Sequence, residues 1–483
     1  MRIQRLCLFS VLAFWLGAAH GEFRTTVLNT GPAVSQSVLV VADRIYVFNV
    51  DDTGRSYRVG VASNDYALGE KSEPLDESVI FFDSLQTPSG PVAVLLARGE
   101  VRSLDKNKQI LQFESIYNAP VIDALPYYDA FRDLNGDGLD DFLMPSFDGY
   151  QLAIQQTDGS FAKPITLIAP PIMDMSYNSH PWYQAKNIFF ADMDLDTRRD
   201  LVFWAEDHFV VYPQLATGAF ASTAFTVPSS VLLDYDSFDG MSVRMSNQDQ
   251  SDKTVRVAYG IEDYNGDGIS DLMTMEVKSS GVFRKKTTFA LHPGRGDIDR
   301  HVVFSAQPTS GIESNGIQYE MESRDLDGDG DLDLIVSSVE LGVGKIIAAL
   351  LTSSVKIDLG VYMMRDGLYA QKPDATREIT ATFSLSSGEF WQPAVLIQDA
   401  NGDGRADLLL QDGEKFELFL GEASPDLFER KALAIETPMP RDPDLIQTAH
   451  INGDGVMDMI MRIPPPLGEP KGQHRVILLV SEP

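Results

Sequence analysis

The chain has 483 residues, of which 44% are hydrophobic, and 70 acidic residues face 39 basic ones for a formal net charge of −31. A chain of this length buries a large core, either as one all-β domain or as several smaller domains. The charge argues against nucleic acid and anionic membranes as partners, because neutralising phosphates requires clustered Lys and Arg. It is compatible with simple solubility or with the binding of many cations.

Residues 1–21 have the pattern of a secretory signal peptide. Arg2 and Arg5 precede the apolar run 6–16, and the small residues of 17–21 offer a cleavage site. An uncleaved anchor is the alternative, and no later segment is long and apolar enough to span a bilayer. The only cysteine, Cys7, lies in this segment, so the mature chain 22–483 contains no disulfide. We therefore expect an exported, monomeric bacterial protein, periplasmic or secreted, whose stability comes from something other than cystine.

A short acidic loop recurs along the rest of the chain. Its six copies are DLNGDGLDDFL from 133, DMDLDTRRDLV from 192, DYNGDGISDLM from 263, DLDGDGDLDLI from 325, DANGDGRADLL from 399 and HINGDGVMDMI from 450. A degenerate seventh copy is aligned with Asp83 at its first position, but its later positions are occupied by Leu85, Thr87 and Pro91. Together the copies are spaced by 50–74 residues, so one repeat runs through the whole mature chain.

Short alternating runs rich in β-forming residues follow each loop and are separated by turns rich in Gly and Asp. With the apolar run before each loop, every repeat supplies about four strands, which is the size of a propeller blade. One blade cannot bury both of its faces, so the repeats must stack around an axis. The sequence predicts an all-β fold with residues 22–483 forming a single β-propeller of seven blades, or eight if residues 22–75 add one. The last repeat is one strand short, and we expect an N-terminal strand to complete it and close the ring.

The loop chemistry points to calcium. With Asp133 as position 1, oxygen-bearing side chains stand at positions 1, 3, 5 and 9, namely Asp133, Asn135, Asp137 and Asp141, and the Leu139 carbonyl is available at position 7. Calcium accepts six to eight oxygen ligands at flexible distances, and glycines at positions 4 and 6 allow a short loop to wrap around an ion. An EF-hand is excluded, because it requires Glu at position 12, which is non-acidic in all six copies.

The loop pattern D-x-[DN]-G-D-G-x-x-D followed by an apolar strand resembles the FG-GAP/VCBS repeats, to which the propellers of integrin α-subunits belong. The resemblance covers most of the mature chain and implies up to six calcium ions, one in the hairpin loop between the first two strands of each loop-bearing blade. The implied ligands, with a backbone carbonyl at position 7, are Asp133, Asn135, Asp137, Leu139 and Asp141; Asp192, Asp194, Asp196, Arg198 and Asp200; Asp263, Asn265, Asp267, Ile269 and Asp271; Asp325, Asp327, Asp329, Asp331 and Asp333; Asp399, Asn401, Asp403, Arg405 and Asp407; and Asn452, Asp454, Val456 and Asp458.

The copies differ in the expected strength of binding. The loop from 192 has Leu195 and Thr197 where the other copies have glycine, so we expect a strained or altered turn. The loop from 450 begins with His450, a poor ligand for a hard cation, and we expect it to bind most weakly. The loop from 325 carries the most negative charge and is expected to bind most tightly.

The sequence favours a non-enzymatic module that binds or adheres to a glycan or a protein, with calcium in a mainly structural role. The alternative is a secreted carbohydrate-active enzyme, similar to polysaccharide lyases, on the same scaffold. The insertion 173–187 contains Tyr177, His180, Trp182 and Tyr183, which would form either an aromatic binding surface or packing between blades. The tripeptide 295–297, Arg-Gly-Asp, is read as a simple turn or as an integrin-ligand motif.

Overall fold

The computed structural model describes most of the mature chain. The described residues are 22–33, 35–121, 123–175, 181–234, 253–281, 285–314, 316–340, 342–383, 390–423, 427–465 and 473–482. The predicted signal peptide, residues 1–21, lies outside them. No helix within these ranges is long and apolar enough to cross a membrane.

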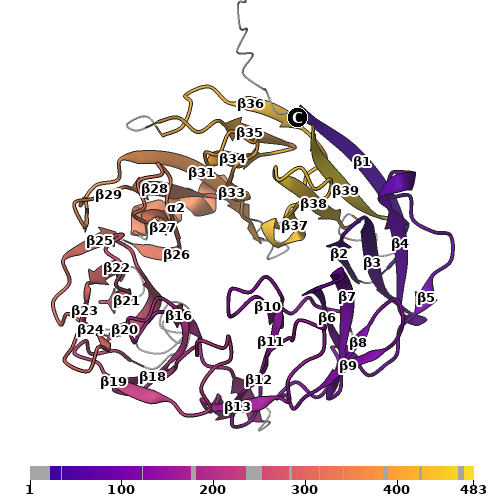
Figure 1. Cartoon of the computed structure of the whole chain (residues 1–483). Coiled ribbons are helices and arrows are strands. Elements are labelled where there is room, and N and C mark those ends of the chain that lie inside the picture. The colour runs from indigo at the N-terminus through magenta and orange to yellow at the C-terminus, as the bar shows by residue number, and fades with distance from the viewer. Residues whose placement is uncertain are drawn as a thin grey trace, which may run out of the picture.

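Eight antiparallel sheets form the blades of a propeller around a central opening (Figure 1). In chain order the first four blades are β2 (Ser35–Val41), β3 (Arg44–Asp51), β4 (Gly54–Val61) and β5 (Glu73–Pro74); β6 (Val79–Thr87), β7 (Gly90–Ala97), β8 (Glu100–Ser103) and β9 (Gln109–Gln112); β10 (Phe131–Arg132), β11 (Asp141–Pro145), β12 (Gly149–Ala153) and β13 (Ile165–Ile168); and β16 (Phe189–Ala191), β17 (Asp200–Ala205), β18 (His208–Tyr212) and β19 (Phe225–Pro228).

Blades 5 to 8 follow the same order from the centre outwards. They are β20 (Lys253–Glu262), β21 (Asp271–Ser279), β22 (Lys285–His292) and β25 (Ser310–Ser314); β26 (Ile317–Arg324), β27 (Asp333–Val339), β28 (Ser354–Tyr362), β31 (Ala375–Phe383) and a fifth strand, β32 (Phe390–Trp391); β33 (Val395–Gln398), β34 (Asp407–Asp412), β35 (Lys415–Phe419) and β36 (Leu433–Glu436); and β37 (Ile446–Ala449), β38 (Asp458–Ile463), β39 (His474–Glu482) and β1 (Glu22–Gly31).

Several short elements are inserted between the blade strands. The hairpins are β14 (Ile172–Met175) with β15 (Pro181–Gln184), β23 (Gly294–Gly296) with β24 (Val302–Phe304), and β29 (Met364–Arg365) with β30 (Leu368–Tyr369). The helix α2 (Val343–Thr352) connects β27 to β28, and two 3-10 turns, η1 (Ala62–Asn64) and η2 (Pro443–Leu445), lie near the ring closure. None of these insertions interrupts the order of the blade strands.

The predicted closure of the ring by an N-terminal strand is confirmed. Strand β1 pairs antiparallel with β39 in a register that runs from Glu22 opposite Glu482 to Leu28 opposite Val476, and thereby forms the outer strand of blade 8 (Figure 1). Residues 35–74 then form blade 1 by themselves, so the blade count is eight, the second of the two numbers that the sequence left open. Pairing β1 with β39 removes the exposed edge that blade 8 would otherwise present.

Apolar side chains on both faces of the blades explain why the strands read as nearly continuous hydrophobic runs. In β39, Val476 and Leu478 pack into the core shared with blade 1, whereas Ile477 and Leu479 pack into the core shared with blade 7. All four side chains are fully buried. Because successive residues of a strand point to opposite faces, each blade contributes to two interblade cores.

Candidate metal centre

The six acidic loops occupy equivalent places in blades 3 to 8. Each connects the first strand of its blade to the second, and the acidic residue at position 9 is the first residue of that second strand. Because this connection recurs at the same end of every blade, the loops share one face of the ring, which we call the loop face. The connections between second and third strands, including helix α2, lie on the opposite face.

Position 1 organises the backbone of the loop. In the first copy, Oδ1 of Asp133 accepts hydrogen bonds from the backbone N–H groups of Gly136 and Asp137 at 2.7 and 3.1 Å, and Oδ2 accepts one from Gly138 at 2.8 Å. The two glycines have positive φ angles of 81° and 84°, a backbone region that glycine enters without steric cost. Asp325 and Asp399 accept the equivalent bonds from the glycines of their own loops.

Positions 5 and 7 are tied together in every copy. The backbone N–H at position 7 donates to Oδ1 of the aspartate at position 5, at 2.8–3.0 Å. The six donors are Leu139, Arg198, Ile269, Asp331, Arg405 and Val456, the residues whose carbonyls were predicted as ligands. The side chains therefore form local turns that fold each loop back on itself.

Position 9 lies beneath the loop and is buried. Asp141, Asp200, Asp271, Asp407 and Asp458 are 0% exposed, and Asp333 is 1% exposed. In each blade Oδ1 accepts a backbone N–H, at 2.7–2.9 Å, from a residue in or just beyond the third strand; these donors are Gln155, Gln214, Gly294, Met364, Gly421 and Ser481. The carboxylate thus joins the start of the second strand to the end of the third.

Burial strongly affects the ionisation of these groups. It raises the pKa of Asp141, Asp200 and Asp271 to about 7, and that of Asp333 and Asp407 to about 6. Neighbouring aspartates of the same loop raise each pKa further, while the backbone N–H donors lower it. A charged form at neutral pH therefore costs free energy unless a cation compensates it.

Some of the buried carboxylate oxygens lack a protein partner of normal geometry. Within the described part of the chain, Oδ2 of Asp141, Oδ2 of Asp271 and Oδ1 of Asp194 have none. Leaving a buried acceptor unpaired costs about 1–3 kcal/mol, and more when the group is charged. These three oxygens belong to positions 9 and 3 of three different loops, where the predicted ligand set requires a free oxygen.

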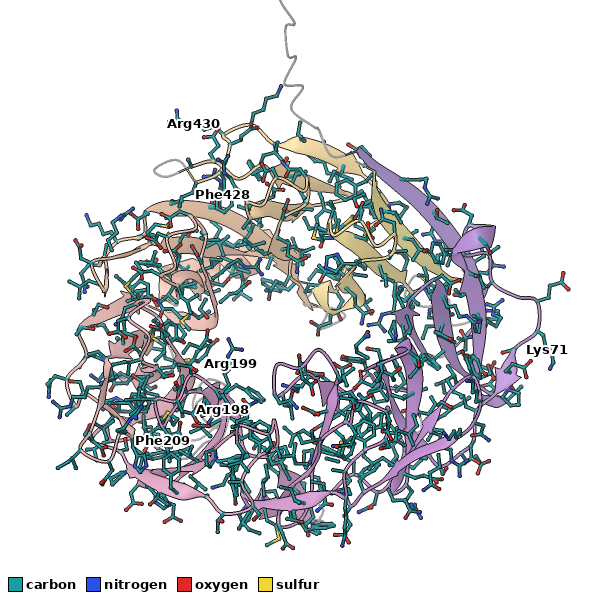
Figure 2. The ribbon with its side chains drawn as sticks, in the orientation of Figure 1. Lys71, Arg198, Arg199, Phe209, Phe428 and Arg430 are labelled. Carbon is teal, nitrogen blue, oxygen red and sulfur yellow. The ribbon has the colours of Figure 1, made fainter. Side chains whose placement is uncertain are left out.

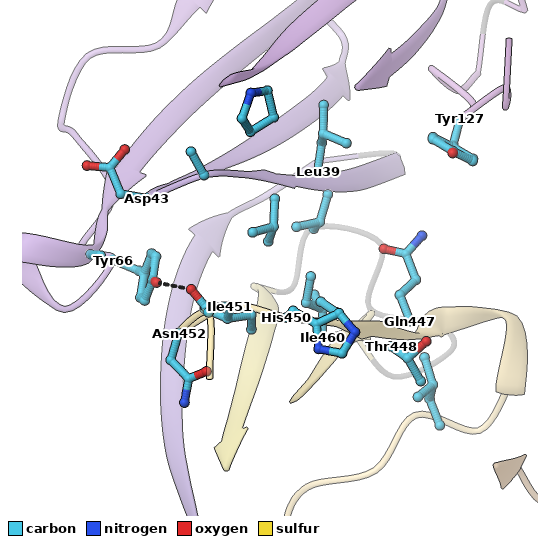
Figure 3. A pocket seen from close by; sticks show the side chains of 18 of the residues that line it. Leu39, Asp43, Tyr66, Tyr127, Gln447, Thr448, His450, Ile451, Asn452 and Ile460 are labelled. Carbon is cyan, nitrogen blue, oxygen red and sulfur yellow. Dashed lines mark hydrogen bonds between the residues drawn. The ribbon is translucent and has the colours of Figure 1, made fainter. Parts of the chain in front are cut away.

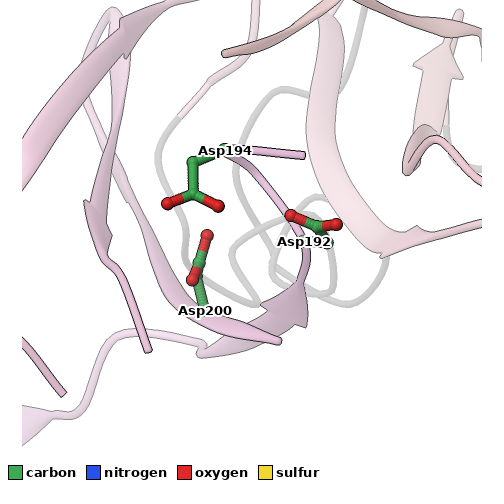
Figure 4. Close-up of side chains that lie close together, drawn as sticks. All are labelled: Asp192, Asp194 and Asp200. Carbon is green, nitrogen blue, oxygen red and sulfur yellow. The ribbon is translucent and has the colours of Figure 1, made fainter. Parts of the chain in front are cut away.

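Two loops bring three carboxylates together. Oxygens of Asp192, Asp194 and Asp200 lie within 4.8 Å of one another, and Figure 4 shows their side chains converging. Asp325, Asp327 and Asp333 form the same arrangement. The clusters contain positions 1, 3 and 9 but not position 5. In the loops from 133, 263 and 399, position 3 is Asn, so an amide oxygen takes the place of the second carboxylate.

The loop from 192 keeps its turn without glycine. Leu195 and Thr197 have φ angles of 58° and 73°, so both residues adopt the left-handed conformation that glycine occupies in the other copies. This conformation is costly for residues with a Cβ, as expected from the sequence. In addition, the Arg198 guanidinium pairs with Asp196 and donates to the Gln214 carbonyl at 2.9 Å. That ion pair competes with a cation for the position 5 carboxylate.

The loop from 450 is closed by its own side chains. Nδ1 of His450 lies 3.0 Å from the Val456 carbonyl oxygen, the group that was predicted to be a ligand. The Asn452 amide donates to Asp454 and to the Ser481 carbonyl, at 2.7 and 2.9 Å. Protein groups therefore occupy acceptors that a cation would need in this loop.

Asp83 has a role that its sequence alignment did not indicate. It lies within β6 opposite Val94, and the hairpin turns only at Thr87 and Gly90, so blade 2 has no acidic loop. The side chain is 1% exposed, and its Oδ2 accepts the N–H groups of Ala130 and Phe131 at 2.8 and 3.0 Å. Asp83 therefore joins blade 2 to blade 3.

The aromatic insertion lies only partly within the described residues. Tyr177 and His180 fall outside them. Trp182 is 43% exposed on the hairpin of β14 and β15, and Tyr183 packs edge-to-face on Phe147 with ring centroids 5.1 Å apart. This hairpin connects blade 3 to blade 4 on the face opposite the loops.

The Arg-Gly-Asp tripeptide lies on the hairpin of β23 and β24. Its Asp297 accepts the backbone N–H groups of Asp299 and His301, at 2.8 and 2.9 Å. The carboxylate thus stabilises the hairpin turn itself, which agrees with the prediction of a simple turn.

Three arginines lie on the first strands or in the acidic loops of their blades, namely Arg132, Arg199 and Arg324. Arg199 points into the opening from blade 4 (Figure 2). Arg132 pairs with Asp129 at 2.8 Å, and Arg324 pairs with Glu322 at 3.0 Å. Of these three arginines, two are thus neutralised by an adjacent carboxylate.

The chain resembles known proteins only distantly. No protein-family model matches the chain, and no curated protein matches it. Among solved structures, a lectin of Agrocybe aegerita that recognises terminal N-acetylglucosamine is 14% identical, with 85% of this chain and 94% of the lectin covered and a TM-score of 0.41. The Vibrio cholerae biofilm matrix protein Bap1 is 12% identical, with 96% of this chain and 92% of the Bap1 chain covered and a TM-score of 0.29. The β-propeller domain of Nup133 from Vanderwaltozyma polyspora is 9% identical, with 97% of this chain and 99% of that domain covered and a TM-score of 0.30.

Proposed function

We propose that the mature chain is an exported calcium-binding propeller of the FG-GAP/VCBS type, and that it serves as a non-enzymatic binding module for a glycan or a protein. The observation that carries the calcium assignment is the set of buried position 9 carboxylates with raised pKa values, two of which have an oxygen without a partner of normal geometry among the described residues. The signal-like pattern of residues 1–21 supports export.

Calcium suits these loops better than other metals. The candidate donors are carboxylate, amide and carbonyl oxygens, which hard cations prefer, and the two carboxylate clusters contain neither His nor Cys. Magnesium requires a nearly ideal octahedron and retains its waters, whereas calcium tolerates the irregular oxygen set of a short loop. When bound, the ion would neutralise part of the negative charge of each loop.

The role of calcium in this proposal is structural. Position 9 already joins the second strand to the third, and the loops are hydrogen bonded to their neighbours around the ring. The Leu332 N–H donates to the Tyr264 carbonyl at 2.9 Å, and the Met457 N–H donates to the Asp399 carbonyl at 3.3 Å. An ion that fixes one loop would therefore also restrain the next blade, in a mature chain without disulfides.

A binding role is supported by exposed side chains on the opposite face. Trp182 is 43% exposed, Met173 63% and Phe147 50%, and helix α2 exposes Ile347 and Leu351 by 53% and 81%. Large exposed apolar groups that gather on one face mark interaction surfaces in many soluble proteins. The loop face would then carry the ions, leaving the opposite face and the ring closure for ligands.

The test uses purified residues 22–483 with a panel of acidic and neutral polysaccharides, in calcium and in chelator. It measures retention on each polysaccharide together with release of unsaturated or reducing ends. We expect retention without product, and a calcium stoichiometry that falls when position 9 residues are changed to Asn. Release of product would show that the protein is a carbohydrate-active enzyme and not a binding module. If no glycan is retained, the result would favour a protein ligand.

A further inference from the structure

A cleft of about 1170 Å³ opens where the first and last blades meet. One wall is strand β2 of blade 1, the other is strand β37 of blade 8 with residues 450–453 of the loop that follows it. Figure 3 shows Gln447 and His450 on the blade 8 side of this space, whereas the Leu39 side chain lies on the other face of β2, which packs against blade 2. The cleft lies at the ring closure and on the loop face, away from the aromatic hairpin of β14 and β15.

The cleft combines apolar walls with uncharged polar groups. Val38, Val40, Ile446, Ile451 and Ile460 form the apolar part. Gln447, Thr448 and His450 supply an amide, a hydroxyl and an imidazole, whereas the Asn452 amide is already bonded to Asp454 and Ser481. Such groups both donate and accept hydrogen bonds, as a ligand rich in hydroxyl groups requires.

Charges at the rim are paired. Arg24 binds Asp65 at 2.6 Å, and Asp43 lies 3.9 Å from Arg44. The cleft therefore offers no concentration of charge, although the whole chain carries −31. That net charge disfavours an anionic ligand, because the field of the protein repels it before contact.

One aromatic ring is available for stacking. Tyr127 lines the cleft, is 48% exposed, and is held by a tilted contact with Phe82 at 5.8 Å between ring centroids. A half-exposed ring that is fixed on its other side can pack against the apolar face of a sugar ring. Gln447, from the opposite blade, has no side-chain hydrogen bond of its own to any described residue, so its amide is available to a ligand.

The cleft is also lined by the one loop whose first position departs from the acidic pattern. His450 stands where the other five copies have Asp, and its Nδ1 bonds to the Val456 carbonyl. Tyr66 fixes the next residue by donating to the Ile451 carbonyl at 3.1 Å. The loop is thus held in place by protein groups, and His450 and Asn452 become part of a cleft wall.

We propose that this cleft binds a neutral oligosaccharide, with a sugar ring packed on Tyr127 and hydroxyl groups bonded to Gln447 and to the loop from 450. The proposal rests on the binding role inferred above and names its site and ligand class. The volume exceeds the roughly 300–1,000 Å³ typical of sites for small ligands, which favours a chain of sugars over a single one.

The experiment measures binding of cellotetraose, chitotetraose, maltotetraose and an oligogalacturonate to residues 22–483 in calcium, by isothermal titration calorimetry. We expect one of the three neutral oligosaccharides to bind. Gln447→Ala and Tyr127→Ala should each raise its Kd by about tenfold or more, the factor that corresponds to about 1.4 kcal/mol. Lys71→Ala, at the outer edge of the ring (Figure 2), should change it by less than about twofold, and Trp182→Ala tests the opposite face as the rival site.

Conservative variants separate a binding role from a folding role. Tyr127→Phe keeps the ring and should leave the Kd within about threefold of the wild type, while Gln447→Glu keeps the size of the side chain, adds a charge and should weaken binding. Melting curves of all variants in calcium confirm that the propeller is intact.

Three results would overturn the proposal. Binding of a neutral glycan that Trp182→Ala abolishes and the cleft variants leave unchanged would move the site to the opposite face while the proposed function survives. Binding of the oligogalacturonate alone would reject the ligand class. Absence of binding to all four probes would reject the cleft as a glycan site, and retention of any polysaccharide by the same protein would show that the proposed function does not depend on it.

Discussion

Replacing Asp271 by Asn should have opposite effects on stability in the presence and absence of calcium. Asp271 is fully buried, its Oδ1 accepts the Gly294 N–H at 2.8 Å, and its Oδ2 has no partner of normal geometry among the described residues. Asn retains an oxygen for the Gly294 N–H but cannot ionise. The substitution therefore removes the buried charge and, in the same step, one of the proposed calcium ligands.

The magnitude follows from the pKa. Burial raises the pKa of Asp271 from 3.8 to about 7, a change of about 3 units, which corresponds to roughly 4 kcal/mol at 1.36 kcal/mol per unit. Because the pKa of the folded state is the higher one, the protonated form stabilises the fold. This stabilisation is complete below the unfolded-state pKa and is lost as the pH rises through about 7.

In chelator, the free energy of unfolding of the wild type should therefore fall between about pH 5 and about pH 8, and Asp271→Asn should be the more stable protein at the higher pH, by up to about 4 kcal/mol. In calcium at that pH the order should reverse, because the ion compensates the wild-type charge and the variant has lost a ligand. Urea titrations of both proteins at both pH values, with and without calcium, measure the eight free energies of unfolding.

The matched control is Asp458→Asn in the loop from 450. Both oxygens of Asp458 accept hydrogen bonds, Oδ1 from Ser481 and Oδ2 from Ile451, so the variant should lose stability in chelator as well as in calcium, and the two losses should differ less than the effects of Asp271→Asn do. The reasoning is refuted if Asp271→Asn changes the free energy of unfolding in the same direction with and without calcium. It is also refuted if the free energy of unfolding of the wild type without calcium does not depend on pH.

Three further predictions concern the other copies. His450→Asp should raise the calcium stoichiometry by one ion per chain in equilibrium dialysis, because it restores position 1 and frees the Val456 carbonyl; an unchanged stoichiometry would contradict this. Burial raises the pKa of Asp83 to about 7, and this residue lies outside any acidic loop. Between about pH 5 and about pH 8, Asp83→Asn should therefore lose less free energy of unfolding than the wild type does, in calcium and in chelator alike. An effect that depends on calcium would be inconsistent with this role. Thr197→Gly should stabilise the protein by about 1 kcal/mol in urea titrations, since Thr197 has a φ of 73°, and a loss of stability would show that its side chain contributes more than the strain costs.

The amino-acid sequence by itself determined the features that are local. The acidic loop, its spacing and the alternating strands predicted an all-β propeller, and the incomplete last repeat predicted closure by an N-terminal strand. The loop is local because positions 1 to 9 fold around their own side chains, so Leu195 and Thr197 already indicated the strained turn that their positive φ angles confirm. Occupation by calcium remains a prediction.

Only the tertiary structure decided features that depend on contacts between blades. Residues 35–74 form a complete blade without any acidic loop, and its fourth strand has only two residues, Glu73 and Pro74, so the sequence left seven and eight blades open and the structure decided for eight. Asp83 was read as a remnant of a loop, whereas it accepts backbone hydrogen bonds from the next blade. The cleft is formed by the two ends of the chain, where strand β2 lies across from strand β37. Closing the ring brings together residues about 400 positions apart, and no periodicity within a repeat specifies such pairs.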